Sequence, residues 1–348
     1  MYCSATTRNR MKGGNRLQIG LIDVDAYGKK PKFPNLALMR ISAWHKSQGD
    51  DVEWYRGPLE VPMYDIVYMS KVFSDSYTPD IPEPTNAAKV IKGGTGYCIS
   101  LVNGREVFDE SKNVSLPPEM EHMFPDYSIY PMFDFAISMT SRGCPRGCSF
   151  CIVAKKEGKG SRKVADVRDF WCGQKHIEVM DANLTACCEK RDLFRQYLDT
   201  GATITFNQGL DIRLLDDDDI ADLNIMRLEK LHFAWDNPKE DLRDRFAYYA
   251  KYGKHTRHGH LATVYVLTNY NSTIEEDLYR IYTLREMGYY PFVAVYNRNG
   301  ADAIYSQLQQ WNNSYLHART VERFEDFSTK TRNEIRKAKT RAKQQTLF

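Results

Sequence analysis

Short apolar runs alternate with polar segments along most of the chain, and their lengths predict strands separated by helices. Runs of about four to eight apolar and β-branched residues are typical of buried strands. Such runs lie at residues 17–24, 51–55, 64–69, 89–92, 135–139, 176–180, 203–206, 230–235, 263–267 and 291–296. Strand and helix segments in alternation favour the α/β class with parallel sheets, whose ligands bind at the carboxyl ends of the strands.

Helix start and stop residues support the segments between the runs. Pro34 and Gly49 bracket one helix, since proline is favoured in the first turn and glycine just past the last. Four consecutive aspartates at residues 216–219 open another helix, where acidic side chains complement the helix dipole. Ser272 with Glu275 has the pattern of a capping box before a third helix.

The strand pattern predicts a series of domains. We expect a disordered lead-in over residues 1–16, which lack the apolar core of a secretory signal. Residues 17–131 predict a doubly wound domain and an irregular, proline-containing linker from about residue 96. Six strands with helices between them predict a partial β/α barrel over residues 132–300. A helical extension with a basic tail is expected over residues 301–348.

Composition excludes several protein classes. Apolar residues make up 42% of the 348 residues, enough for a sizeable core. No apolar run reaches the roughly 18–20 residues that a membrane-spanning helix needs, so we expect no membrane partner. Eight cysteines in a chain of this length do not form a disulfide framework and fit a reducing cytoplasm. A net charge of +3 does not by itself imply a polyanionic partner.

The strongest chemical signal is a short loop that contains Cys144, Cys148 and Cys151. Gly143 and Gly147 can adopt positive φ, which favours a tight loop over a helix. Three thiolates are one short of the four ligands of a structural zinc or an ordinary four-iron cluster. A three-ligand site leaves one metal position open for a substrate, but these residues alone also allow a zinc knuckle or a loop of thiols.

The spacing C-x₃-C-x₂-C, with Phe150 directly before the last cysteine, resembles the cluster loop of radical SAM enzymes. The resemblance implies a [4Fe–4S] cluster on Cys144, Cys148 and Cys151, with S-adenosylmethionine (SAM) chelating the fourth iron. Reductive cleavage of SAM would yield a 5′-deoxyadenosyl radical for the modification of a substrate, with methylation and methylthiolation among the reactions open to it. An external reductant such as flavodoxin or ferredoxin is implied as a partner, and no catalytic side chain is assigned.

The same resemblance implies which residues hold SAM in a partial (β/α)₆ TIM-type barrel. Asp181 and Asn183 stand where the family holds the SAM amino group, and Phe150 is placed beside the cofactor. Gln208 and Arg213 follow the next strand, and the guanidinium of Arg213 suits the SAM carboxylate. The positions that would pack on the adenine are Val266, Thr268 and Asn269.

The first domain resembles the cobalamin-binding type of Rossmann-like domain that precedes many radical SAM barrels. Residues 23–28 take the place of its D-x-H-x-x-G loop, and residues 93–95 take the place of its Gly-Gly turn. Position 25 is an aspartate and not the histidine that ligates cobalt, so any bound cobalamin would lack that ligand. Without the resemblance, the Gly-Gly turn is simply a bend that ends a strand.

Three further groups of residues each allow two interpretations. The basic residues between positions 155 and 163 form either a loop that meets an anion or a solvated surface. His255, His258 and His260 form either a metal site or a solvated loop. Auxiliary cluster ligands or small buried apolar side chains are the two interpretations of Cys172, Cys187 and Cys188.

The C-terminal residues 328–348 hold seven Lys or Arg against one Glu, a net charge of +6. Such a tail either keeps the protein soluble or binds a nucleic acid, and in the second case binding would weaken steeply with salt. For the whole chain, the alternative to an enzyme is a non-catalytic α/β binding protein in which a metal staples the loop.

Overall fold

The protein is of the mixed α/β class with parallel sheets, as the sequence predicts. A computed structural model describes residues 16–59, 63–103, 105–256, 262–328, 330 and 332–333. The expected lead-in, His258, His260 and most of the basic tail lie outside these residues. The chain divides into two compact units, Met1–Ile204 and Thr205–Phe348, which are described separately below. No helix in the described part is long and apolar enough to cross a membrane.

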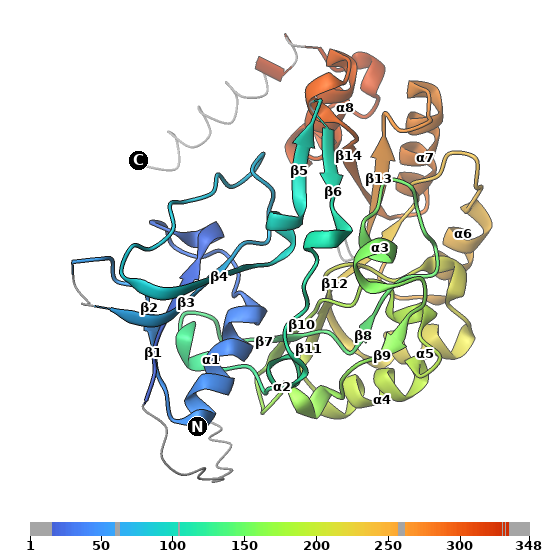
Figure 1. Cartoon of the computed structure of the whole chain (residues 1–348). Helices are drawn as coiled ribbons and strands as arrows, with labels where there is room; N and C mark the ends of the chain where they lie inside the picture. Colours follow the sequence, from blue (N-terminus) through green and yellow to red (C-terminus); the bar gives the residue numbers. More distant parts are fainter. Residues whose placement is uncertain are drawn as a thin grey trace, which may run out of the picture. The chain divides into compact units, whose positions relative to one another are not determined.

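A four-stranded parallel sheet forms the first part of the chain (Figure 1). Its strands are β1 (Gln18–Asp23), β2 (Asp51–Trp54), β3 (Tyr64–Ser70) and β4 (Ala87–Gly93). The strand order is β2-β1-β3-β4, and every pair of neighbours is parallel. All four strands lie at the predicted places, because each is a short apolar run bounded by polar residues.

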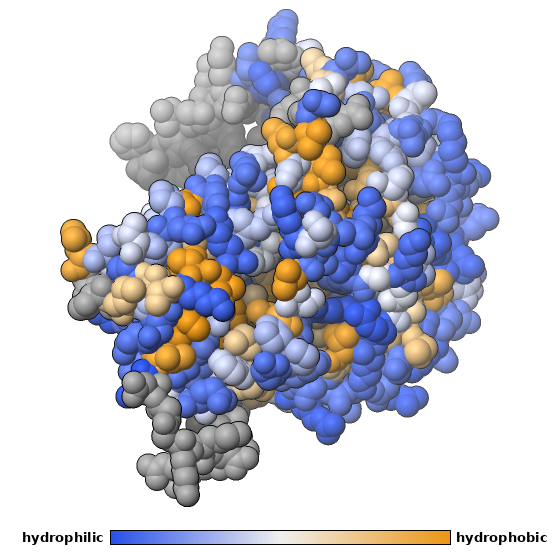
Figure 2. All heavy atoms as spheres, viewed as in Figure 1, coloured by the Kyte–Doolittle hydropathy of each residue, from blue (hydrophilic) through white to orange (hydrophobic). Residues whose placement is uncertain are grey.

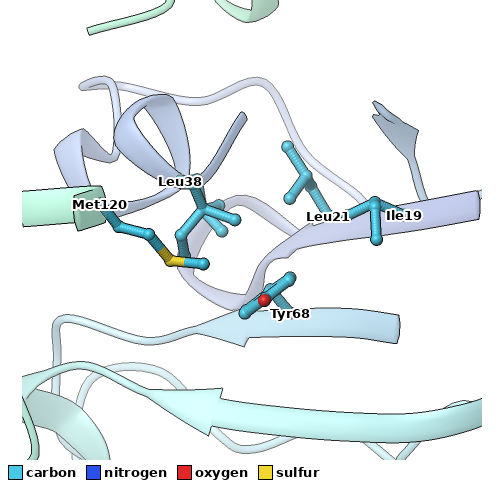
Figure 3. Packing of buried hydrophobic residues seen from close by; sticks show 6 residues of the cluster. Ile19, Leu21, Leu38, Tyr68 and Met120 are labelled. Atoms are coloured by element: carbon cyan, nitrogen blue, oxygen red, sulfur yellow. The ribbon is translucent and has the colours of Figure 1, made fainter. Parts of the chain in front are cut away.

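Helix α1 (Leu36–Gln48) packs its apolar face against this sheet. The Asn35 side chain caps its first turn, and Gly49 ends it at a φ of 91°, as predicted for that glycine. Figure 3 shows Leu38 of α1 and Met120 beside Tyr68 of the sheet. The buried apolar residues of the helix are Leu38, Met39 and Ile41.

A second sheet has the strand order β14-β13-β12-β11-β10-β7. Its strands are β7 (Ala136–Ser138), β10 (His176–Val179), β11 (Thr203–Phe206), β12 (Arg227–Ala234), β13 (Ala262–Thr268) and β14 (Tyr290–Val295). All six lie where the apolar runs predict them. Strand β10 is parallel to β7 within the first unit, and β12, β13 and β14 are parallel to one another within the second.

Helices follow most of these strands. They are α4 (Lys190–Thr200), α5 (Asp217–Ile225), α6 (Arg243–Tyr252), α7 (Ile274–Glu286), α8 (Ala303–Asn312) and α9 (Tyr315–Thr320). Asp216 caps α5 in a capping box with Asp219, which confirms the predicted role of the aspartate run. The prediction of the α7 capping box is wrong by one residue. Thr273 and Glu276 form it, because α7 begins at Ile274.

The predicted linker after residue 96 is more regular than its prolines suggest. Strands β5 (Ile99–Val102) and β6 (Arg105–Phe108) form an antiparallel hairpin, and α2 (Pro118–Glu121) follows. Short 3₁₀ helices lie at Val24–Ala26, Thr95–Cys98, Glu110–Lys112, Tyr127–Ile129, Val167–Asp169, Leu184–Ala186, Ile212–Leu214, Arg298–Gly300 and Phe324–Asp326.

The surface seen in Figure 2 is mostly hydrophilic with small separate apolar patches.

We expect Leu38→Ala to lower the free energy of unfolding by about 2–5 kcal/mol, because it leaves a cavity in a fully packed cluster. The matched control is Leu59→Ala, since Leu59 is 98% exposed and should change stability by less than about 0.5 kcal/mol. Chemical denaturation of both variants checks this. Equal losses in the two variants would contradict the packing of α1 on the first sheet.

Candidate functional site

The cysteine loop lies in the first unit and is bounded by a two-stranded ribbon. Strand β8 (Ser141–Arg142) pairs with β9 (Arg162–Lys163), and α3 (Val153–Glu157) lies between them in sequence. The Cys144 amide donates to the Gly158 carbonyl at 3.2 Å. The two ends of the loop are therefore held together, and the cysteines lie in a closed loop that projects from the sheet.

Two glycines allow the loop to close. Gly143 has a φ of 90°, and a Cβ atom there would lie 2.1 Å from the Gly160 carbonyl oxygen. That contact is far closer than atoms tolerate, so only glycine fits at position 143. Gly147 has a φ of 58° between the first two cysteines, as the sequence predicts for a tight loop.

The three predicted metal ligands differ in exposure. Cys144 and Cys151 are half-buried, Cys148 is exposed, and Phe150 is half-buried between the last two. Within the described residues, no three His, Cys, Asp or Glu side chains surround a single metal-ion position. A structural zinc needs its ligands around one point, whereas the cysteines of a [4Fe–4S] cluster bind different irons. In type, number and spacing, the three thiols fit a cluster with one open iron.

Asp181 fixes the base of the loop and is almost fully buried, with 3% of its surface exposed. Its carboxylate accepts hydrogen bonds from the amides of Thr140 and Ser141, at 2.9 and 2.5 Å, and from their hydroxyls, at 2.9 and 2.6 Å. Asp181 follows β10, and these two residues follow the parallel strand β7. The carboxylate therefore joins the carboxyl ends of the two strands at the point where the cysteine loop begins.

The environment of Asp181 is dry. Burial raises the pKa of this carboxyl to about 6, although the four donors act to lower it. The group is thus ionised at neutral pH, the state in which both oxygens accept hydrogen bonds. Tyr197 of α4 lies 3.1 Å from the Thr140 hydroxyl and completes the network. The prediction that Asp181 contacts SAM is not tested by this geometry, but its carboxylate is already engaged within the chain.

A second polar cluster holds the strand that enters the loop. Arg142 of β8 and Arg40 of α1 both donate to the Glu121 carboxylate, at 2.5 and 2.6 Å. Arg40 also donates to the Ser138 hydroxyl at the end of β7, at 3.1 Å. A buried guanidinium is costly to leave unpaired. The bonds of Arg40 and Arg142 therefore hold α1, α2 and β7 at the base of the loop.

Asn183 is brought directly to the cysteine loop. Its Nδ2 lies 3.5 Å from the Cys144 sulfur, and its Oδ1 accepts a hydrogen bond from Thr185 at 2.9 Å. Asn183, which is predicted to bind the cofactor, thus has a hydrogen bond to a cysteine of the loop. The structure therefore brings together two predicted site residues from separate segments of the chain.

The second unit holds the remaining predicted SAM contacts. Gln208 is exposed after β11, and Arg213 is half-buried. Arg213 donates from Nε to Asp211 at 2.6 Å and from Nη1 to Glu240 at 2.7 Å. A guanidinium has five N–H donors, so these two bonds do not use all of them.

Val266 and Thr268 of β13 are fully buried. Asn269 follows them at a φ of 60°, where its amide donates to Asp277 at 3.3 Å and its side chain donates to the Tyr296 carbonyl at 3.0 Å. The buried pair Asp277–Arg280 lies beneath this turn, and Arg280 also donates to the Leu267 carbonyl at 2.9 Å. This end of β13 is a rigid turn whose side chains are packed or bonded.

The predicted cobalamin loop has structural roles of its own. Asp23 accepts a hydrogen bond from the Tyr130 hydroxyl at 2.7 Å, and its pKa is raised by burial. Asp25 accepts from the amides of Val72 and Phe73, which follow β3. Gly94 has a φ of 102°, and a Cβ atom there would lie 2.3 Å from the Lys71 carbonyl oxygen. These contacts explain both motifs as loop packing at the carboxyl edge of the first sheet.

The basic loop and the scattered cysteines are also bonded within the chain. Lys163 lies between Asp166 and Asp192, at 2.6 and 2.8 Å, and these hydrogen bonds raise its pKa. The thiols of buried Cys187 and exposed Cys188 both donate to Glu189. Burial raises the pKa of Cys187 to about 11, so it is a neutral thiol at pH 7.

The predicted solvated histidine loop needs a correction. His255 is buried and its Nδ1 lies 2.8 Å from the Tyr249 hydroxyl. Burial lowers its pKa to about 4, so the ring is neutral at pH 7. The ring of Tyr249 stacks on this residue, which the polar neighbours in sequence did not indicate.

Sequence reasoning missed the residues that hold the site in place. Thr140 and Ser141 lie between a predicted strand and Cys144, and two hydroxyl residues at that junction were an available signal. Nothing in the sequence singles out Arg40 or Glu121, which become neighbours only through the fold. Thr185 likewise gains its role from the orientation of Asn183.

We expect Asp181→Asn to speed hydrogen exchange of the Thr140 and Ser141 amides by about 10- to 100-fold. The amide side chain presents donors where the carboxylate accepted them, which costs about 1–3 kcal/mol for each unsatisfied group. The control is Asp199→Asn at the exposed end of α4, which should leave these amides unchanged. Unaltered protection in Asp181→Asn would show that another contact holds the base of the loop.

Comparison with known proteins gives little further information. No family model matches the chain, and no curated protein matches it. Two solved structures of OxsB, a cobalamin-dependent S-adenosylmethionine radical enzyme, do match: one has aqua-cobalamin bound, the other aqua-cobalamin and S-adenosylmethionine. The identities are 11% and 12%, each with a TM-score of 0.39 and with 81% of this chain and 49% of the OxsB chain covered. The chain thus spans about half the length of OxsB, and a likeness this low carries no conclusion about fold, cofactor or activity.

Proposed function

We propose that this protein is a radical SAM enzyme whose cluster is held by Cys144, Cys148 and Cys151. The observation that carries the proposal is the three-cysteine loop, which leaves the carboxyl end of β7 and is closed at its base. Three thiols on one tight loop supply ligands for three irons and leave the fourth for SAM. We also propose that the chain forms a Rossmann-like domain followed by a partial (β/α)₆ barrel.

The chemistry comes from the cofactors, and the chain has to hold them and keep competing reactions out. When bound, the cluster supplies the electron that cleaves SAM to the radical that modifies the substrate. The residues of the chain hold the base of the loop. Asp181 fixes its first strand through Thr140 and Ser141, and the glycine at 143 allows the close crossing with Gly160.

The alternative is a binding protein in which one metal ion staples the loop. A staple of this kind needs four ligands around one point. The loop itself supplies three cysteines, one fewer than such a staple needs. The exposure of Cys148 also fits a site that a second molecule must reach.

In this proposal, Arg213 holds the SAM carboxylate, because its remaining N–H donors can form a charge-assisted bond. Phe150, Gln208, Val266, Thr268 and Asn269 are the further positions predicted to lie along SAM. Cobalamin on the first sheet stays a prediction, and Asp25 would give it no histidine ligand. The substrate class is left open.

The cysteine assignment predicts that Cys144→Ala, Cys148→Ala and Cys151→Ala each lose most of the bound iron. Loss of one of three thiolates removes a ligand that no other residue of the loop replaces. Iron and sulfide content and the visible charge-transfer band after anaerobic reconstitution measure the effect. A protein that binds zinc in place of iron under these conditions would support the alternative.

Cys98→Ala is the matched control for these variants. Cys98 is buried in the first unit, where its thiol approaches the carbonyls of Gly94 and Lys112. It should keep the iron content and the spectrum of the unaltered protein. If the three loop variants keep as much iron as Cys98→Ala, the loop does not hold a cluster.

We expect Arg213→Gln to weaken SAM binding by about 10- to 100-fold, because a charge-assisted bond contributes about 1.5–3 kcal/mol. Equilibrium binding of SAM to the reconstituted protein measures it, with iron content unchanged. Arg243→Gln is the control, since Arg243 is exposed and pairs with Asp241. Equal affinity in the two variants would remove Arg213 from the SAM site.

A further inference from the structure

The Asn183 side chain is held at both ends. Its Nδ2 lies 3.5 Å from the Cys144 sulfur, and its Oδ1 accepts from the Thr185 hydroxyl at 2.9 Å. Asn183 is 5% exposed and Thr185 is 3% exposed. The hydroxyl of Thr185 thus orients the amide so that its N–H group, and not its oxygen, is directed toward the sulfur.

The local backbone does not explain why an asparagine stands here. Asn183 precedes the short 3₁₀ helix Leu184–Ala186 at the N-cap position, where asparagine usually caps the first turn. Its side chain makes no capping hydrogen bond in this structure. The side chain is therefore used for the sulfur and for Thr185, and not for the end of the helix.

A neutral thiol is a weak acceptor for such a donor. A thiolate that carries negative charge is a much better acceptor, since hydrogen bonds with one ionised partner are about twice as strong. A buried N–H directed at a cysteine therefore fits a sulfur that is ionised when the site is loaded. In iron–sulfur proteins, hydrogen bonds to the sulfurs are one of the factors that set the reduction potential.

We propose that Asn183 is a positioning residue that raises the reduction potential of the cluster through its hydrogen bond to Cys144. This inference rests on the proposed function. Reduction adds an electron, which places more negative charge on the cysteine sulfurs, so an N–H donor stabilises the reduced form more than the oxidised form. Thr185 acts one step further out by keeping the amide in the orientation that donates.

This assignment differs from the SAM contact that the sequence predicts for Asn183. Thr185 uses one of the two lone pairs of Oδ1 and the sulfur one of the two N–H groups of Nδ2, so the bond to sulfur is a role distinct from a SAM contact. The two roles lead to different measurements: a SAM contact changes SAM affinity, whereas a bond to sulfur changes the potential of the cluster.

The test compares the full-length, anaerobically reconstituted protein with four variants by redox titration followed by electron paramagnetic resonance without SAM. Asn183→Leu removes the donor at similar size, and Asn183→Asp removes it and adds a negative charge. The midpoint potential should fall in Asn183→Leu and fall further in Asn183→Asp. Thr185→Val should shift it in the same direction by less, and Thr185→Ser, which keeps the hydroxyl, should not shift it.

An unchanged midpoint in both Asn183 variants, with full iron content, would overturn the inference and leave the proposed function standing. Weaker SAM binding without a shift in potential would do the same and would return Asn183 to the SAM site. If the unaltered protein forms no cluster, the proposed function fails and the inference fails with it. Should the Asn183 variants not fold, Thr185→Val decides, because Thr185 acts on the sulfur through Asn183 in this proposal.

Discussion

The buried carboxylate of Asp181 is the constraint on which the site depends. Four donors from Thr140 and Ser141 converge on it, and together they compensate for taking a charge out of water. A network of this kind with some groups left unpaired would stabilise the fold less than an apolar contact, so the donors stay in place together. Since these donors immediately precede the cysteine loop, Asp181 helps to fix the direction in which the loop leaves the sheet, together with the bonds of Arg142 and Arg40 to Glu121.

Most of the strands could be predicted because each is a local apolar run, and the structure has all ten of them. Helix ends were predictable where one residue type is strongly favoured, as at Gly49 and Asp216. The hairpin β5–β6 was missed because prolines in the same stretch predicted a linker. The capping box of α7 was wrong by one position because Ser272 and Thr273 are both good caps, and only the start of the helix decides between them.

The cysteine loop could be predicted from the sequence, because its chemistry depends on the spacing of three cysteines within ten residues. The contacts around it were not readable, because Asp181 meets Thr140 only through the pairing of β10 with β7, about 40 positions apart in sequence. Asp181 and Arg213 were predicted as SAM contacts from their places at strand ends. A strand end, however, also needs its own polar groups satisfied, and the structure shows both side chains bonded within the chain.

Asp181 and Asn183, which both contact the cysteine loop or its base, lie only two residues apart in sequence. Asp181 and Asn183 are both buried, whereas Ala182, at the bend between them, is less buried. Asp181 engages Thr140 and Ser141 while Asn183 reaches Cys144, further along the same segment. The anchor of the loop and the donor to its first cysteine thus come from one strand end, so a shift of β10 would move both contacts together.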